Sequence, residues 1–317
     1  MSELPPGYHL RRPQDADAEA IVALMVASDV ADGRRPDSTR EDLVSDWGLP
    51  RFDRSRDAWV VVAPDRSIVG YAWGWDRVAH VDVQADLYVR PDLRDRGVEA
   101  VLLDLLEERA REHLGAAPRG ADVLISLFTR PAGGMASLLD SRGYGKVRTF
   151  LRMTIDLGRG YPAPLTPAGI EIRPFRRGQD ERALHDVIAE SFAGHFRFAP
   201  EPHDEWVARR EGHPDFDPDL WQLACEGGTV VGGVLPYQFG DLGWIRELGV
   251  RSAWRGRGIG KALLLATFRA FEFRGQHRIS LGVDAANASG ATRLYEGVGM
   301  FVEERHDLYQ LPIRPDP

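Results

Sequence analysis

An internal repeat constrains this chain more than any other feature of its sequence. Residues 90–103 (RPDLRDRGVEAVLL) and 251–264 (RSAWRGRGIGKALL) are identical at six of fourteen aligned positions, at a constant offset of 161. The same offset relates Arg12-Pro13 to Arg173-Pro174, and a third match follows further on. Matches that recur in one order indicate duplication. The 317 residues therefore predict two similar domains of about 150 residues each.

A segment rich in proline and glycine separates the two halves. Residues 158–169 (GRGYPAPLTPAG) contain three Pro and three Gly, which cannot hold a helix or a central strand. We expect a linker here, with one domain at residues 1–157 and the other at residues 170–317.

Both halves predict the same order of strands and helices. Each begins with a short strand and a helix, continues with strands, and reaches a strand that runs into the Arg/Gly repeat (86–89 and 245–250). A helix leaves the repeat and ends near Gly115 or Gly275, as glycine after a helix predicts. A strand, a short helix and a closing strand complete each half. The fold class is therefore α/β, with mixed α+β layers: a twisted mixed sheet flanked by helices in each of two tandem domains.

Composition excludes several classes of protein. The chain is 43% apolar and 28% charged, as in globular proteins with real cores. No run approaches the roughly 18 apolar residues of a membrane span, and no secretory signal is visible. A single cysteine, Cys225, excludes an intramolecular disulfide and a cysteine-based zinc cage, and we expect it to be a buried apolar residue. The net charge of −8 argues against nucleic-acid binding. We expect a cytoplasmic protein with no membrane or nucleic-acid partner; the oligomeric state is open.

The loop Arg255-Gly-Arg-Gly-Ile-Gly260 carries the chemistry. Its glycines allow a tight turn, and the helix that follows begins with unpaired N–H groups and a positive dipole end. Together these form a cradle for a pyrophosphate, with Arg255, Arg257 and Lys261 adding positive charge. A turn that binds nothing is the other interpretation. Neither the Walker A pattern nor GxGxxG fits the loop.

The loop resembles the acetyl-CoA loop of the GNAT acetyltransferase superfamily, whose pattern [RQ]-x-x-G-x-[GA] is matched by Arg255-x-x-Gly258-x-Gly260. The stretch Asn287-Ala-Ser-Gly-Ala-Thr-Arg-Leu-Tyr295 is similar to the second signature of that family. The resemblance covers nearly all of residues 170–312. The first half is similar in outline but has weaker motifs, as expected of a tandem two-domain member.

The resemblance implies a role for each site residue. The backbone of Leu248 and Val250 would pair with the pantetheine arm of acetyl-CoA, and Asn287 would bond its amides, unless Asn287 only caps the following helix. The N–H groups of the loop would hold the pyrophosphate, through Arg255, Gly256, Arg257, Gly258, Ile259, Gly260 and Lys261.

Two side chains would move protons. Tyr295 would be the general acid that protonates the departing thiolate, although it also fits an ordinary half-buried helix position. Glu247 is the first candidate for the general base, although it also fits an ordinary exposed strand position. Asp284 is the second candidate for the base.

The repeat also predicts that the first domain does not catalyse. Glu99 and Asp95 replace Gly260 and Gly256, which puts carboxylates beside the expected pyrophosphate position. At the position of Tyr295 the first half has Leu139. We expect poor acetyl-CoA binding there and a role in packing or in shaping the acceptor site.

The resemblance thus implies an acetyl-CoA-dependent N-acetyltransferase that acts on a primary amine, expected on a small molecule, by direct attack in a ternary complex without metal. A peptide or protein N-terminus is an alternative acceptor. A regulatory or scaffolding module that binds acyl-CoA without transfer is the alternative from another class. The histidines of 190–215 lack the spacing of a helical zinc site. We expect a loop-rich segment over the acceptor site, in which the aromatic residues either pack or receive a cationic or ring-bearing amine, packing being the first interpretation.

Overall fold

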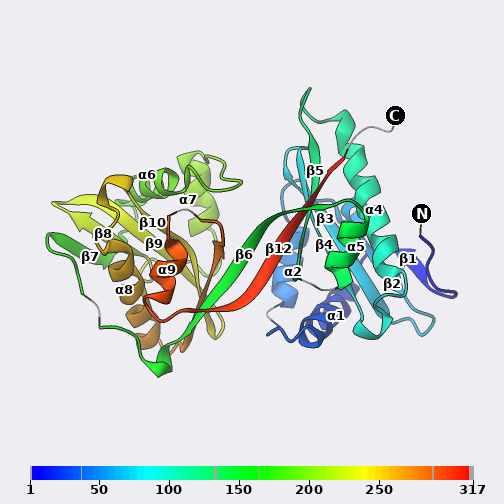
Figure 1. Cartoon of the computed structure of the whole chain (residues 1–317), viewed down its shortest axis with the longest axis horizontal. Helices are drawn as coiled ribbons and strands as arrows, with labels where there is room; N and C mark the ends of the chain where they lie inside the picture. The colour runs from blue at the N-terminus through cyan, green and yellow to red at the C-terminus, as the bar shows by residue number, and fades with distance from the viewer. Residues whose placement is uncertain (1, 37, 132–133, 164, 288, 314–317) are drawn as a thin grey trace. The chain divides into compact units, whose positions relative to one another are not determined.

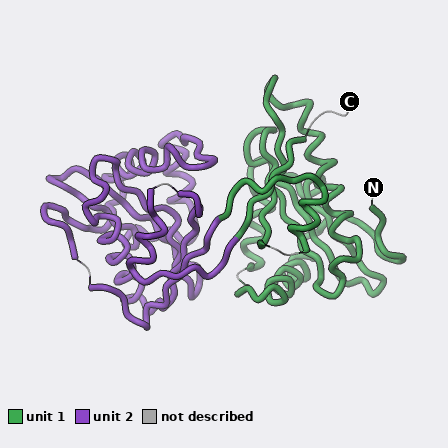
Figure 2. Tube along the Cα trace, in the orientation of Figure 1, with its two compact units in different colours: residues 1–149, 306–317 green, residues 150–305 purple. Residues whose placement is uncertain are grey.

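The computed structural model describes residues 2–36, 38–131, 134–163, 165–287 and 289–313. They form two compact units, residues 1–149 with 306–317 and residues 150–305, coloured separately in Figure 2. Within the described residues no helix is long and apolar enough to cross a bilayer.

Unit 1 is a mixed sheet with helices on both faces (Figure 1). Its strands lie in the order β1-β2-β3-β4-β5-β12, and the pair β4–β5 is parallel. Their bounds are His9–Arg11, Ala58–Val62, Ile68–Val78, Asp82–Val89, Val123–Thr129 and Phe301–Ile313. One face packs on α1 (Ala18–Ala31) and α2 (Arg40–Trp47), and α3 (Arg54–Asp57) precedes β2. The other face packs on α4 (Val98–Glu112) and α5 (Gly134–Ser141).

Unit 2 repeats this plan. The strand order is β7-β8-β9-β10-β11-β6, with a parallel β10–β11 pair. The bounds are Ile170–Pro174, Gln222–Glu226, Thr229–Phe239, Leu242–Val250, Arg278–Asp284 and Gly145–Asp156. On one face lie α6 (Glu181–Phe192) and α7 (His203–Glu211). On the other lie α8 (Ile259–Phe273) and α9 (Ala291–Glu296). Cys225 is buried in β8, as expected.

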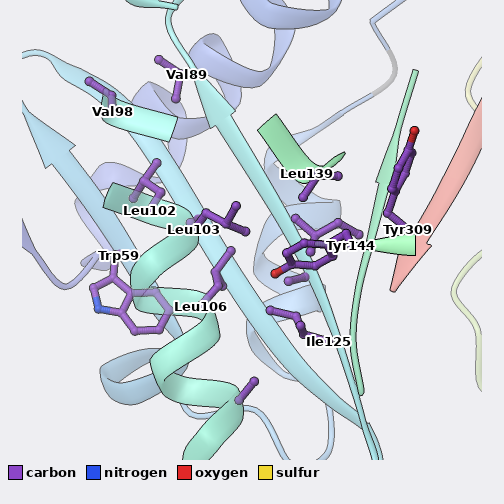
Figure 3. Packing of buried hydrophobic residues seen from close by; sticks show 14 of the residues in the cluster. Trp59, Val89, Val98, Leu102, Leu103, Leu106, Ile125, Leu139, Tyr144 and Tyr309 are labelled. Atoms are coloured by element: carbon purple, nitrogen blue, oxygen red, sulfur yellow. The ribbon is translucent and has the colours of Figure 1, made fainter. Parts of the chain in front are cut away.

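Burial explains why these segments form strands and helices. The run Ala-Trp-Val-Val-Val of β2 is buried at every position, as in a central strand covered on both faces. Figure 3 shows Leu102, Leu103 and Leu106 of α4 packed against the sheet of unit 1. Spacings of three and four residues place these side chains on one face of the helix. The α/β fold of each half is therefore confirmed.

The final strand of each half lies in the other unit. In β6, residues 150–156 pair antiparallel with β11 of unit 2. In β12, residues 307–313 pair antiparallel with β5 of unit 1, and Tyr309 belongs to the core of that unit. The units therefore differ from the contiguous domains 1–157 and 170–317 that the repeat predicts. The chain crosses between units within β6 and β12, and segment 158–169 lies inside unit 2, between β6 and β7.

Candidate active site

Two neighbouring strands of unit 2 separate halfway along their length. The parallel pairing of β10 with β11 covers only Gly243–Ile245 and Ile279–Leu281. Beyond it, β10 continues to Val250 on β9, and β11 continues to Asp284 on β6. A register shift between Ile245 and Glu247 marks the point where the strands part, as a β-bulge does by bending its strand. The backbone groups of residues 246–250 that face β11 are left without a strand partner among the described residues. Leu248 and Val250 lie in this segment, as the sequence predicts.

The Arg/Gly loop begins where β10 ends. A 3₁₀ turn (Ser252–Trp254) leads into it, and α8 starts after Gly258. Gly256 and Gly258 have φ of 76° and 81°, a left-handed backbone that favours glycine. The first helical bond runs from the Ala262 N–H to the Gly258 carbonyl (3.0 Å). The N–H groups of Ile259, Gly260 and Lys261 are thus left without helical acceptors, which makes this end of α8 suited to an anion.

Gly260 allows α9 to pack closely over the start of α8. A Cβ built there would lie 3.0 Å from Cδ2 of Leu294 on α9, closer than real Cβ atoms usually come to a neighbour. The same contact shows that α9 packs over the start of α8. Because Leu294 precedes Tyr295, the loop and the tyrosine-bearing helix are adjacent.

The basic residues of the loop have different environments. The Arg255 guanidinium donates to the carbonyls of Val250 (3.1 Å) and Ser191 (3.3 Å). Arg257 pairs with Glu226 at 2.5 Å, and that carboxylate also accepts a bond from Trp254 (2.7 Å). Arg255 and Arg257 therefore brace the loop. Lys261 is exposed and makes no ion pair among the described residues, so it is the cation left to face a ligand.

Tyr295 is buried, with 8% of its surface exposed, and packs in the core of unit 2. Burial raises the pKa of Tyr295 to about 12, so the hydroxyl stays protonated in neutral solution. Within the described part of the chain that hydroxyl makes no hydrogen bond, whereas a buried polar group normally has a partner. A proton donor without a protein acceptor suits the general acid that the sequence predicts.

Asn287 lies between β11 and α9 and does not cap that helix. The cap residue of α9 is Gly290. The Asn287 side-chain oxygen instead accepts the Ser289 N–H (2.8 Å), and its own N–H bonds the Asp284 carbonyl (3.0 Å). Its side-chain amide donates to none of the described residues, so this group is available to a ligand.

Glu247 is held by an arginine that the sequence does not single out. Its two carboxylate oxygens accept from Arg210 of α7, at 2.5 and 3.1 Å. Arg210 is 6% exposed, bonds Glu201 at 3.0 Å and lies over the Trp206 ring. Burial lowers the pKa of Arg210, but its bonds to Glu247 outweigh that effect and leave the pKa above its usual value. Trp206 and Arg210, four residues apart and both buried, share one helix face; this spacing is the one signal that could have revealed the contact.

His195 lies near the ends of the separated strands. Burial, and then the charge of Arg255, lowers its pKa, an effect that Asp284 opposes. Asp284, the last residue of β11, accepts the Ala286 N–H (2.8 Å). The segment 190–215, expected near the acceptor, thus contributes His195 from a loop and Arg210 from a helix.

The Acetyltransferase (GNAT) family model matches residues 23–128 and 182–300 of this chain, one region in each half. The chain belongs to the GNAT acetyltransferase family. A mycothiol acetyltransferase from Geodermatophilus obscurus is 31% identical over 94% of this chain and 96% of its own length. The tandem GNAT architecture that the sequence predicts is confirmed by these matches. The protein is thus an N-acetyltransferase of the tandem GNAT type.

Solved structures agree with this assignment. A GCN5-related N-acetyltransferase from Sphaerobacter thermophilus is 37% identical, with a TM-score of 0.88, over 99% of this chain and 98% of the other. A tandem GNAT protein from the clavulanic acid biosynthesis pathway has a TM-score of 0.71 at 18% identity, over 98% of this chain and all of the other. The latter likeness shows the fold alone.

Unit 1 of this GNAT chain has the strand separation but a different loop. The pairing of β4 with β5 stops at Ala85 and Leu127, while both strands continue to Val89 and Thr129. Gly97, with φ of 90°, stands at the start of α4. Burial raises the pKa of Glu99, while the N–H groups of Glu99 and Asp95 oppose that shift. Unit 1 thus carries a carboxylate at the helix start where unit 2 has Gly260.

Proposed function

We propose that unit 2 transfers the acetyl group of acetyl-CoA to a primary amine of a small molecule, by direct attack in a ternary complex. The observation that carries this proposal is the combination, in unit 2, of separated strands, a glycine-lined helix start with unbonded N–H groups, and a buried tyrosine hydroxyl without a protein acceptor. Each feature suits one part of a CoA thioester: the pantetheine arm, the pyrophosphate and the sulfur.

Binding would use groups that the chain leaves free. The backbone of Leu248 and Val250 would bond the pantetheine arm as an added strand does, assisted by the Asn287 side-chain amide. The N–H groups from Gly256 to Lys261 would hold the pyrophosphate, with the Lys261 ammonium beside it. Arg255 and Arg257 would act by holding the loop in shape.

The transfer step needs one proton acceptor and one proton donor. The amine nitrogen attacks the thioester carbonyl carbon, a C–N bond forms, and the C–S bond breaks. Glu247, directly or through a water, would take the proton that the amine loses, with Asp284 as second candidate. Tyr295 would give its hydroxyl proton to the departing thiolate and recover one from solvent. Arg210 would keep the Glu247 carboxylate in one orientation.

The charge of the site and the similarity to named relatives support a small cationic acceptor. Glu247 and Asp284 lie on the two strands that separate, so carboxylates would flank an amine that arrives between them. The relatives named mycothiol acetyltransferase match this chain over nearly their whole length, and such a name describes an enzyme acting on a small molecule.

The test combines calorimetry with an assay of CoA thiol release over a panel of amines and peptides. Gly260→Glu copies the residue of unit 1 into unit 2. Like charges about 4 Å apart repel by roughly 1 kcal/mol in water and several times more in a desolvated site, so we expect at least about tenfold weaker CoA binding. Gly158→Glu is the matched control, because Gly158 is exposed with open space around it.

The wild-type chain should bind one CoA and release thiol with small amines. Two equal tight sites per chain, or unchanged affinity in Gly260→Glu, would contradict the assignment to unit 2. Release with peptides alone would move the acceptor to an N-terminus, and CoA binding without any release would make the protein a sensor.

A further inference from the structure

Unit 1 brings two histidines and a buried aspartate together, away from the loop of α4. Asp76 lies near the end of β3, His80 in the turn between β3 and β4, and His113 just after α4. One ligand atom of each residue lies within 4.8 Å of the other two. The two Nδ1 atoms of His80 and His113 are 2.8 Å apart, and Oδ2 of Asp76 is 3.6 Å from Nδ1 of His80.

The β3–β4 turn is shaped to present these atoms. The β3–β4 register shifts between Asp76 and Val78, and His80 has φ of 63°, a left-handed conformation uncommon outside glycine. Oδ1 of Asp76 accepts the His80 N–H at 2.7 Å. Oδ1 of Asp76 thus fixes the turn, while Oδ2 faces the His80 imidazole. Residues held in uncommon backbone conformations cluster at functional sites.

The second carboxylate oxygen has no hydrogen-bond partner among the described residues. The Asp76 side chain is 3% exposed, yet Oδ2 has only the contact to His80 and one of 3.7 Å to Nε of Arg51. Both exceed hydrogen-bond length, although a buried carboxylate normally has short partners. The donation of Arg51 Nε to the Asp76 carbonyl (3.0 Å) holds the backbone and does not satisfy Oδ2.

The spacing fits a tetrahedral metal ion after small movements. Zn²⁺ takes histidine nitrogen and carboxylate oxygen at about 2.0–2.2 Å, which places ligand atoms roughly 3.3–3.5 Å apart. The distances of 2.8 and 3.6 Å fall on either side of that value. The His80 side chain is 42% exposed, so its ring has room to rotate and solvent can reach the site. At 2.8 Å, a single hydrogen fits between the two Nδ1 atoms.

We propose that Asp76, His80 and His113 bind a divalent transition-metal ion of the zinc type, through Oδ2 and the two Nδ1 atoms, with water completing the shell. Imidazole and carboxylate ligands suit such ions. The ion would join the β3–β4 turn to the end of α4. Its role would be to stabilise unit 1, separately from acetyl transfer in unit 2. Residue spacing does not reveal this site, because only Asp76 and His80 are close in the chain. A turn rather than a helix brings these two residues together.

The test is metal binding by the chelator-treated full-length chain. Zn²⁺ is titrated against a chromophoric competitor, and Co²⁺ is added to read the visible absorption bands that report its coordination. We expect one ion per chain and a higher midpoint of thermal unfolding with Zn²⁺. Loss of a ligand in His80→Ala, His113→Ala or Asp76→Asn should weaken binding by at least about tenfold, since even residues behind the ligands change affinity 10–100-fold. His9→Ala, an exposed histidine of unit 1, is the control.

Folding is checked for each variant by circular dichroism. Should His113→Ala fail to fold, the half-exposed His80 and the conservative Asp76→Asn still give the result. Wild-type protein that binds neither ion, or ligand variants that bind as tightly as His9→Ala, would overturn the proposal and leave a hydrogen-bonded imidazole pair. The thiol-release assay is run on the same samples: loss of metal binding with unchanged transfer separates this site from that of unit 2.

Discussion

Replacing Tyr295 by Phe should move activity and stability in opposite directions. The hydroxyl is buried and has no hydrogen-bond partner among the described residues, and burial alone raises its pKa to about 12. The hydroxyl oxygen is not among the fully buried side-chain atoms that lack a partner, so at most a small part of the roughly 1–3 kcal/mol cost of an unsatisfied buried polar group applies. Tyr295→Phe should therefore leave the free protein as stable as wild type or about 1 kcal/mol more stable.

The same change should slow transfer. A positioned general acid contributes about 10²–10⁴-fold, and the lower figure corresponds to about 2.7 kcal/mol in the activation barrier. The sign of the pH effect follows from the raised pKa of Tyr295. The protonated donor persists below a pH of about 12, so this residue should cause no fall in kcat between pH 7 and 9. Both kcat and CoA affinity are measured, because a proton donor changes the first and not the second.

Tyr144→Phe is the matched control. Tyr144 is buried in unit 1, and its hydroxyl bonds Oε1 of Glu107 at 3.3 Å. Loss of this bond should lower the free energy of unfolding by about 0.5–1.5 kcal/mol. The thermal midpoint should fall by a few degrees, and kcat should not change. If Tyr295→Phe binds CoA normally and keeps full kcat, Tyr295 is not the donor. Equal losses of kcat in both variants would point to a general effect on the fold.

Three further predictions use the repeat and the buried charges. Gly258→Ala and Gly97→Ala each place a Cβ on left-handed backbone (φ 81° and 90°), and each should cost about 1–2 kcal/mol in thermal unfolding. Only Gly258→Ala should weaken CoA binding in calorimetry, and equal weakening would contradict the assignment. Burial, and then the charge of Asp46, raises the pKa of Asp86 to about 7. Because folding favours the protonated form of Asp86, the free energy of unfolding should fall as pH rises from about 4 to 7, by up to about 4 kcal/mol. Denaturant unfolding should show this slope in wild type and a smaller one in Asp86→Asn; identical slopes would refute the assignment. Arg210→Met leaves Glu247 without its buried partner and should cost about 3–5 kcal/mol, whereas Arg209→Met, at an exposed cation on Glu201, should cost under about 1 kcal/mol in the same thermal assay.

Local features of the fold could be predicted from the sequence because they rest on nearby residues. The helix expected after the Arg/Gly loop, ending near Gly275, is α8 (Ile259–Phe273). Gly256 and Gly258 do take the left-handed backbone that a tight loop needs. Periodicity, helix caps and glycine positions all act within a few residues, so one sequence contains them.

Features that depend on distant residues could not be predicted. The exchange of final strands depends on which sheet edge receives β6 and β12, and both strands carry the alternating pattern that either edge accepts. The pairing of Glu247 with Arg210 spans 37 positions. The sequence allows two roles for Asn287, a helix cap or a ligand contact. The start of α9 at Ala291 excludes the cap.

The two units together indicate how one copy of a duplicated GNAT domain changes without losing its fold. The strand separation is the same in both, because it is set by the sheet and its register. What differs lies on the helix starts, where unit 1 has Glu99 at the position of Gly260. Leu139 is fully buried where α9 carries Tyr295, so the core is kept while the hydroxyl is lost. Since each change leaves the apolar packing intact, neither needs compensation elsewhere. This is how unit 1 can keep its stability without the two groups that we propose for acetyl transfer in unit 2.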